Sequence, residues 1–424
     1  MYSYKYKNIF GGTFMANILI TGGQLNNKGA QAMSYTVISK LKKHFINDTI
    51  IMISNKDFVR SEEEKKFYNF EFAPLDNVMK LETLGMGYSF LGRLWNLKIG
   101  KRSSIDSLKE SKNFKTLLED TKFIIDISGY SFSSQWPFKN SLFYLFTIKI
   151  AKRYNIPMFI LPQSLGPLKY DSFFKQKIIK YFSKSLFKYP TRVYPREQEG
   201  FDLITKFSNA NVKQAYDIVL QNGYEIDPSV IFTSKYKWIQ NLPMVSSNSV
   251  AIIPNQKIMK HGDDARNYQL YQTMIDHLLE KGKSIYLLRH SFEDLYIIEQ
   301  LKSMYSDEKR VVALDGDYNC LELKEILSNF NFVIASRYHS IIHSYLEYVP
   351  AIVLGWAVKY QELLQAFTQS KYIFDVRESM KDIDLINAVD TMEENYEKES
   401  DVIRNKVHKI QENSIFDEIF NKLK

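Results

Sequence analysis

Arg337 and His339, two positions apart, are the side chains of this sequence best suited to act together on an anion. An arginine can hold a carboxylate or a phosphate through two parallel hydrogen bonds, and an imidazole can give or take a proton near neutral pH. An isolated Arg-x-His pair is more often structural, with the arginine bonded to a surface carboxylate and the histidine partly buried. The rest of the chain therefore decides how this pair is interpreted.

The residues around the pair predict a strand that turns into a helix. Residues 332–335 are an apolar run typical of a buried strand, and apolar positions at helical spacing follow Ser336, a residue type that often caps helices. The start of a helix offers free backbone N–H groups and the positive end of the helix dipole, so it attracts anions. Ser336 and Ser340 are therefore expected to add donors beside Arg337.

Two further histidines are interpreted as structural. His343 lies one helical turn after His339 and is expected to support it, since side chains four positions apart share one helix face. His290 ends a different predicted strand.

A second strand–turn–helix unit lies near the start of the chain. Residues 17–21 predict a strand, residues 22–29 a glycine-rich turn and residues 30–45 a helix. The turn matches neither the G-x-G-x-x-G dinucleotide pattern nor a Walker loop. A loop of this kind can still present backbone amides to a phosphate or a carboxylate.

Strands and helices alternate along both halves of the chain, which predicts two doubly wound parallel sheets. We expect an α/β fold with a Rossmann-like domain at 15–230, a second at 246–385 and a charged helical tail at 386–424. Two such domains facing a cleft form the architecture of B-type glycosyltransferases, in which the last helices cross back to the first domain. Residues 60–115 are expected to hold helices and a mobile loop, and residues 1–14 a loose extension.

Composition narrows the class of protein. The chain has 424 residues and a net charge of +8, but acidic and basic side chains are interspersed, so a nucleic-acid surface is not expected. A single cysteine, Cys320, excludes an intramolecular disulfide and a cysteine-based metal cluster. With no signal segment and no apolar run of ~20 residues, the expected location is the cytoplasm. Residues 261–264 contain a histidine and two aspartates but are interpreted as a loop, and no metal is expected.

Several strand-end loops together resemble the polysaccharide pyruvyl transferases, which move the enolpyruvyl unit of phosphoenolpyruvate onto a sugar as a ketal. The matching positions run in the order of that family from about residue 17 to 365: Asn27-Lys28-Gly29-Ala30-Gln31-Ala32, Pro162-Gln163-Ser164-Leu165-Gly166-Pro167, Arg196-Glu197, Asp217, Arg337-Tyr338-His339 and Lys359. Two positions depart from the family pattern. Ala30 replaces a common acidic residue, which indicates a different acceptor subgroup, and Trp356 replaces the usual tyrosine before Lys359.

The resemblance implies roles for these residues. Arg196, Arg337 and Lys359 would bind the carboxylate and phosphate of the donor, and His339 would protonate its methylene carbon as general acid. Further substrate contacts are expected from Ser336, Ser340, Gln163, Ser164, Asn27, Lys28 and Gly29. The base that activates the sugar hydroxyls stays open between Glu197, Asp217 and Asp126, the last two at the ends of predicted strands, and departing phosphate.

Some of these residues have a structural alternative. Arg196 could form a salt bridge with Glu199 or Asp202 instead of binding substrate, and Gln163 and Ser164 could satisfy loop backbone.

The resemblance also implies partners but leaves alternatives open. Besides phosphoenolpyruvate, and with no cofactor, we expect a sugar acceptor on a lipid or nucleotide carrier and peripheral contact with the cytoplasmic membrane face. The oligomeric state is not indicated. A B-type glycosyltransferase using a nucleotide sugar is the alternative, although only Glu347 and Glu362 follow the predicted helix as candidate ribose ligands. A non-catalytic sugar-binding relative is disfavoured by the intact Arg337, His339 and Lys359.

Overall fold

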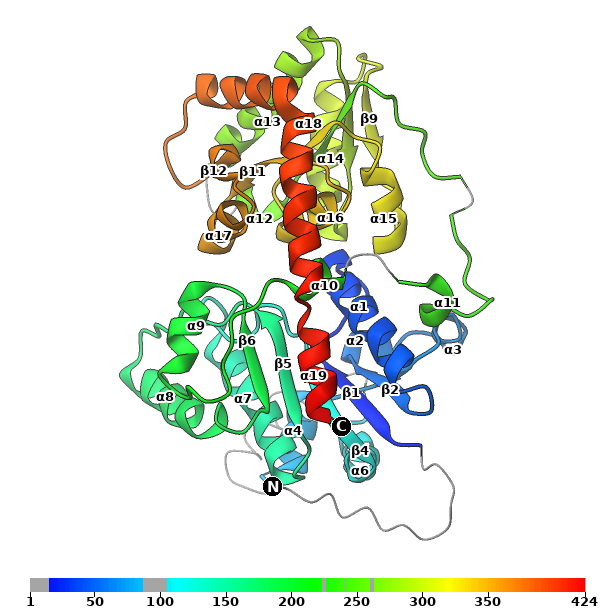
Figure 1. The fold of residues 1–424 in the computed structure, drawn as a ribbon, viewed down its shortest axis with the longest axis vertical. Coiled ribbons are helices and arrows are strands. Elements are labelled where there is room, and N and C mark those ends of the chain that lie inside the picture. The colour runs from blue at the N-terminus through cyan, green and yellow to red at the C-terminus, as the bar shows by residue number, and fades with distance from the viewer. Residues whose placement is uncertain (1–14, 87–104, 223–225, 240, 260–262, 424) are drawn as a thin grey trace.

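The computed structural model describes residues 15–86, 105–222, 226–239, 241–259 and 263–423. The predicted extension at 1–14 and part of the predicted loop within 60–115 lie outside these ranges. The chain forms two parallel six-stranded sheets with helices on their faces, one below the other in Figure 1. The predicted fold class, two Rossmann-like domains, is confirmed.

The N-terminal sheet has the order β3-β2-β1-β4-β5-β6. Its strands are β1 (Asn17–Thr21), β2 (Thr49–Ile53), β3 (Glu71–Ala73), β4 (Thr121–Asp126), β5 (Met158–Gln163) and β6 (Arg192–Pro195). The helices of this half are α1 (Lys28–His44), α2 (Asn55–Phe58), α3 (Glu62–Lys65), α4 (Asn77–Thr83), α6 (Ser107–Glu119), α7 (Phe138–Arg153), α8 (Phe173–Leu186), α9 (Gln198–Thr205), α10 (Ile218–Asn222) and α11 (Pro228–Ile231).

The C-terminal sheet has the order β12-β11-β10-β7-β8-β9. Its strands are β7 (Ser249–Ile253), β8 (Ser284–Leu288), β9 (Val311–Leu314), β10 (Phe332–Ala335), β11 (Ala351–Gly355) and β12 (Ile373–Asp375). The helices of this half are α12 (Gln256–Met259), α13 (Asp264–Glu280), α14 (Leu295–Met304), α15 (Cys320–Leu327), α16 (Tyr338–Leu346), α17 (Val358–Ala366), α18 (Asp382–Glu412) and α19 (Ile415–Leu423).

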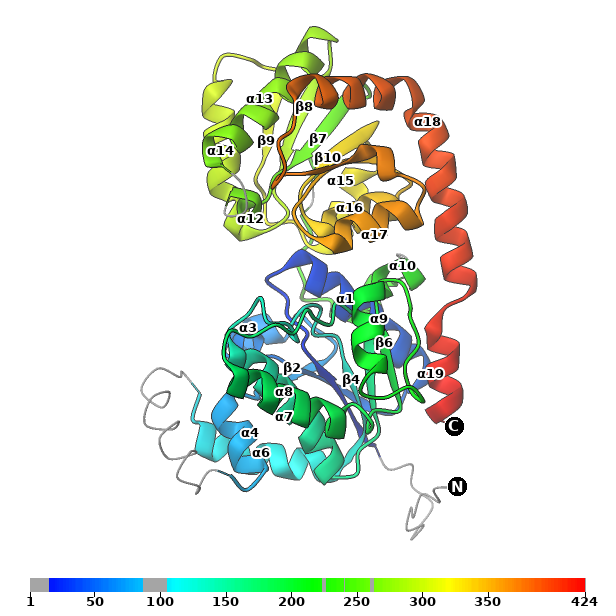
Figure 2. The ribbon, with the colours of Figure 1, turned by 90° about the vertical axis from the view of Figure 1, so that its left-hand side faces the viewer.

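In both sheets the strand order reverses between two central strands. These are β1 and β4 in the first sheet and β7 and β10 in the second. Ligands of open α/β sheets bind where the strand order reverses, beyond the carboxyl ends of the strands. The fold thus directs the turn after β1, the end of β4 and the turn after β10 toward the space between the domains (Figure 2).

The C-terminal helices cross from the second domain to the first (Figures 1 and 2). Helix α18 has 31 residues; it first crosses the second domain and then turns toward the first, where it contacts α10 (Figure 2). After it, α19 packs on the N-terminal sheet, where Glu418 forms a 2.7 Å salt bridge with Arg192 and the ring of Phe420 stacks on His44. The apolar positions of α18 therefore connect the two domains.

The domains also touch directly through α1, which contacts α15 and α16. The side-chain oxygen of Gln31 accepts a 2.7 Å hydrogen bond from the backbone N–H of Cys320. Lys28 reaches Asp317 at 2.8 Å. The start of α1 is consequently held against the second domain.

One local expectation is corrected, and three elements were not predicted. Asp217 does not end a strand: it immediately precedes α10, and its Oδ1 accepts from the backbone N–H of Val219 at 3.0 Å. Helix α8 was not expected, because its apolar residues lie on both faces. The short edge strands β3 and β12 were not expected either, because three residues carry too little alternation to be recognised.

Candidate active site

The turn between β10 and α16 is fixed by buried hydrogen bonds. Ser336 is not the helix cap as expected; the capping position is Arg337, whose side chain makes no capping bond. The hydroxyl of Ser336 is fully buried and lies 2.7 Å from the hydroxyl of Tyr271. The backbone carbonyl of Ser336 accepts hydrogen bonds from the side chain of Asn255 at 2.8 Å and from the hydroxyl of Tyr360 at 3.2 Å. Ser336 therefore holds the end of the strand.

The side chain of Arg337 is held on one side by Asp294, the last residue of a short 3-10 helix (Phe292–Asp294) that follows β8. Its Nε and Nη2 both bond this carboxylate, the latter at 2.7 Å, and Nη2 also reaches Glu293 at 3.3 Å. Burial raises the pKa of Asp294 even though the guanidinium opposes that shift. Within the described residues Nη1 makes no hydrogen bond, so one edge of this buried guanidinium has no protein partner.

His339 lies between the two domains. Its Nε2 is 3.4 Å from Oδ2 of Asp217, which is long for a hydrogen bond but within ion-pair range once the imidazole is protonated. On the other side its ring lies against Gly29 of α1, where an added Cβ would approach the ring to 2.3 Å. Only a glycine at this point allows α1 to pass so close to the imidazole.

Asp217 belongs to a buried charge network in the first domain. Arg196 donates to Asp217 at 2.5 Å, to Glu197 at 2.8 Å and to the hydroxyl of Ser164 at 2.6 Å. That hydroxyl in turn donates to Glu197 at 2.9 Å. Although burial acts to raise it, the pKa of Asp217 is held below its usual range by His339 and Arg196. Asp217 is therefore a buried carboxylate held between Arg196 and His339.

Lys359 points its ammonium into a group of aromatic rings. Its Nζ lies 5.3 Å from the ring centres of Tyr130 and Tyr338 and 5.5 Å from those of Trp356 and Tyr360. Burial, and then the nearby Arg196, lower its pKa to about 7. Its charge thus responds to pH and to any anion that binds beside it.

Gln163 and Asp126 form a second polar centre in the first domain. Gln163 donates to Asp126 at 2.7 Å, while its side-chain oxygen is buried with no hydrogen-bond partner among the described residues. Nearby Lys80 donates to the carbonyl of Phe143 at 3.0 Å, and burial lowers the pKa of Lys80 to about 8. These groups can orient hydroxyl groups of a ligand.

Two cavities lie between the domains and a third recess opens in the first domain. Arg196, Asp217, Tyr338 and Lys359 line the first, of about 440 Å³, together with Lys406 and Lys409 of α18. The second, of about 980 Å³, is lined by Asn27, Lys28, Tyr130, Trp136, Lys257 and Asp317, among others. The recess, of about 260 Å³, includes Lys80 and Asp126, and shares Ser128, Ser131 and Asn140 with the second cavity.

The structure thus separates the predicted residues into two groups. Arg196 and Lys359 line the smaller cavity, and Asn27 and Lys28 the larger. The others form or support the walls: Gln163, Ser164, Ser336, Arg337 and Ser340 are buried. The hydroxyl of Ser340 donates to the carbonyl of Arg337 at 2.7 Å, and Asn27 caps α1 through the backbone N–H of Ala30.

His343 and His290 lie behind the site, with their ring nitrogens 3.1 Å apart. Burial, and then the neighbouring His339, lower the pKa of His343 to about 3, so His343 is a neutral neighbour of His339. Among the described residues no group of three or more histidine, cysteine or acidic side chains is arranged to hold a metal ion. His261 and Gly262 lie outside the described residues, whereas Asp263 caps α13.

Several site residues carried no usable signal in the sequence. Asp294 is 43 positions from Arg337 and lies in an ordinary helix-start sequence, so only the fold reveals the clamp. Lys406 and Lys409 belong to the charged tail, and nothing in their spacing indicates a cavity. Tyr130 lies in an aromatic strand-end loop and could have been named on that ground.

No helix in the described ranges is long and apolar enough to cross a membrane.

Comparison with known proteins identifies the fold. The chain is similar to the glycotransferase of kitacinnamycin (9% identity, TM-score 0.56, covering 97% of this chain and 100% of the other). It is similar to UDP-GlcNAc 2-epimerase from Neisseria meningitidis (12%, 0.53, covering 96% and 98%) and to that from Methanocaldococcus jannaschii (12%, 0.50, covering 88% and 92%). At these identities the likeness concerns the two-domain fold alone.

The sequence comparison is more specific. The family model described as polysaccharide pyruvyl transferase matches residues 27–357, a span that begins in the turn before α1 and ends after β11. Gly29, Asp217 and His339, which meet between the domains, all lie within it. This chain belongs to the polysaccharide pyruvyl transferase family.

Proposed function

We propose that the protein transfers the enolpyruvyl group of phosphoenolpyruvate to a sugar of a surface-polysaccharide precursor, forming a cyclic ketal. The observation that carries this proposal is the meeting of His339 with Asp217 between the domains. It places an imidazole beside a buried carboxylate that Arg196 also binds.

The donor carries a carboxylate and a phosphate, and each loses water when it binds. Lys359 and the unbonded edge of Arg337 are the groups assigned to these charges. Tyr338 lies between Arg337 and His339 in sequence, and its ring centre is 5.5 Å from that of His339. Arg196 has its three nitrogens engaged by Asp217, Glu197 and Ser164, so its role is to shape the electrostatic field.

The reaction begins when protonated His339 gives its proton to the methylene carbon of the donor, which leaves a cationic centre at C2. A sugar hydroxyl adds to C2, and a second hydroxyl adds as the C2–O bond to phosphate breaks. One hydroxyl proton restores the imidazolium of His339, which Asp217 stabilises, and the other leaves with phosphate. Glu197 and Asp126 are bonded to Arg196 and Gln163, so departing phosphate is the favoured acceptor of that second proton.

The acceptor is assigned to the larger cavity and its recess. The recess offers Lys80, Asp126 and Asn140 as hydrogen-bonding groups beside the rings of Phe143 and Tyr144, which suits a hexose. The larger cavity adds Lys28 and Lys257, which suit the diphosphate of a lipid or nucleotide carrier. Ser131 lines both spaces, so one extended ligand can occupy them together.

Ligand-induced thermal stabilisation tests the donor. Phosphoenolpyruvate at a hundred times its dissociation constant should stabilise the folded protein by about 2.7 kcal/mol. UDP-sugars at the same concentration should stabilise it much less, and pyruvate and phosphate serve as separate controls. Stabilisation by UDP-sugars without any by phosphoenolpyruvate would replace the proposal with the nucleotide-sugar glycosyltransferase alternative.

A further inference from the structure

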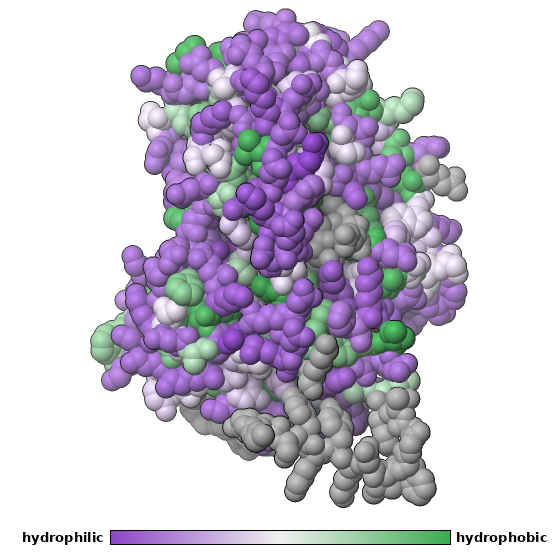
Figure 3. Space-filling view, in the orientation of Figure 1, coloured by the Kyte–Doolittle hydropathy of each residue, from purple (hydrophilic) through white to green (hydrophobic). Residues whose placement is uncertain are grey.

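Helix α8 presents large apolar side chains to solvent. Phe173, Phe174 and Tyr181 are 74%, 76% and 71% exposed, and Ile178 is 41% exposed. Light green hydrophobic atoms stand out among purple ones at the left edge of the lower domain in Figure 3, where Figure 1 shows α8. Contiguous apolar side chains on a surface usually mark a binding face.

The opposite side of α8 fixes this orientation. Ile179, Ser183 and Leu186 are buried against the domain, and the ring of Phe182 meets Phe146 of α7 at 6.0 Å. Residues four positions apart lie on one face of a helix, so Phe174, Ile178 and Tyr181 form a single outward stripe. These side chains cannot turn inward without unpacking the helix.

The charge around this stripe is mostly positive. Residues 169–188 contain six lysines and one acidic residue, Asp171. Five lysines stand exposed in or just after the helix: Lys175, Lys177, Lys180, Lys184 and Lys188. Aromatic and aliphatic side chains flanked by lysines are the composition of helices that lie in the interface of an anionic bilayer.

We propose that α8 is a membrane-docking helix whose outward face binds the surface of a bilayer containing anionic lipids. A second copy of the chain fits this face less well, because two copies would bring lysines against lysines. In a bilayer the apolar stripe enters the acyl boundary while the lysines stay at the headgroups.

The position of α8 connects this face with the larger cavity. The loop before α8 is joined to the loop that lines that cavity: the backbone N–H of Ser134 donates to the carbonyl of Pro167 at 2.8 Å, and that of Lys169 donates to the hydroxyl of Ser134 at 2.9 Å. Tyr130, Ser131 and Trp136 belong to the second loop. Docking through α8 would therefore bring the cavity near lipid-linked acceptors. This last step rests on the proposed function, whereas bilayer binding does not.

Vesicle flotation tests the proposal with the full chain. We expect binding to vesicles of 70% phosphatidylcholine and 30% phosphatidylglycerol, no binding to pure phosphatidylcholine, and weaker binding in 0.5 M salt. The double variant Phe173→Ser/Phe174→Ser should lower the partition coefficient at least tenfold, and Lys177→Gln/Lys184→Gln should do the same. Both pairs are exposed, so circular dichroism and thermal melting should match the unaltered protein.

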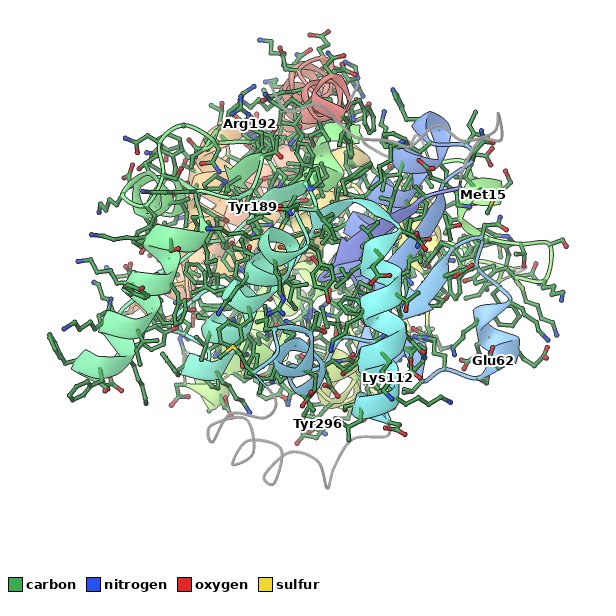
Figure 4. All side chains as sticks on the ribbon, turned by 90° about the horizontal axis from the view of Figure 1, so that it is seen from below. Met15, Glu62, Lys112, Tyr189, Arg192 and Tyr296 are labelled. Atoms are coloured by element: carbon green, nitrogen blue, oxygen red, sulfur yellow. The ribbon has the colours of Figure 1, made fainter. Side chains whose placement is uncertain are left out.

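Matched controls separate this face from general charge or hydrophobicity. Lys109→Gln/Lys112→Gln on α6 removes the same charge, and Tyr296→Ser on α14 removes another exposed ring; neither should change binding. Figure 4 shows Lys112 and Tyr296 away from α8. Equal loss in the controls, or no binding by the unaltered protein, would overturn the proposal. So would a dimer in sedimentation that Phe173→Ser/Phe174→Ser dissociates.

Turnover with a water-soluble acceptor should be unchanged in the α8 variants. A protein that binds vesicles but is not stabilised by phosphoenolpyruvate would refute the proposed function and leave this inference intact.

Discussion

The two halves of the site are built in different ways. In the first domain Ser164, Arg196, Glu197 and Asp217 bond one another in a closed network. In the second, Lys359 makes no hydrogen bond or ion pair within the described residues and lies among aromatic rings.

This contrast indicates a division of labour. Buried charges that satisfy one another are fixed before substrate arrives, so the first half supplies a constant field. A partly buried ammonium that makes no ion pair can form one with a bound anion, so under the proposed function the second half would supply the group that responds to the donor. The sequence predicts that Arg196 and Lys359 both bind the donor. Substitutions of these two residues should nevertheless have different effects on stability and on donor affinity.

The largest expected effect is on turnover through His339. His339→Ala should lower the rate of ketal formation by about 10²–10⁴-fold, because it removes the proposed general acid. Affinity for phosphoenolpyruvate, measured by calorimetry, should stay within a few-fold. His408→Ala, on the exposed side of α18, is the matched control and should behave as the unaltered protein. Near-normal turnover of His339→Ala would remove this residue from the mechanism.

Arg196→Met should act on stability more than on donor affinity. It leaves the buried carboxylates of Asp217 and Glu197 without their cation, which costs about 3–5 kcal/mol of unfolding free energy. Arg192→Met on the same strand breaks the half-exposed pair with Glu418 and should cost less than about 1 kcal/mol. Urea denaturation compares the two. Equal costs would mean that the network is not the fixed half of the site.

Gly29→Ala tests how the two halves of the site depend on each other, because a substitution in the first domain would displace a side chain of the second. An added Cβ would lie 2.3 Å from the imidazole of His339, so the ring must move. A displacement of about 1 Å at a catalytic group can lower the rate about 10²-fold. Normal turnover in Gly29→Ala would show that the position of the imidazole is not limiting.

The smallest expected effect is on the pH dependence of donor affinity. With a pKa of about 7, Lys359 is charged below that pH and neutral above it, so affinity should fall about tenfold from pH 6 to pH 8. Lys359→Arg keeps its charge throughout and should flatten the profile, as measured by titration calorimetry. An unchanged slope in Lys359→Arg would assign the pH dependence to another group.

Sequence reasoning predicted the fold correctly because the fold rests on local patterns, and it assigned the candidate site to strand ends on the same ground. Apolar runs such as residues 332–335 must be buried, and their alternation with helical segments leaves few topologies other than parallel sheets. The strand ends then collect at one edge, so His339 and Lys359 could be assigned to a common cleft. Helix α8 was not predicted, because its exposed phenylalanines add apolar positions outside the single stripe by which an amphipathic helix is recognised.

Which residues touch one another was decided by the tertiary structure alone. Asp294 against Arg337, Gly29 against His339 and Asp217 against both Arg196 and His339 join segments that are far apart in the chain. Residue types and spacing carry no record of such distances, since they depend on how the two domains pack through α1 and α18. The sequence itself determined two parallel-sheet domains with charged residues at their strand ends; the packing of the domains decided which of these charges pair with one another and which do not.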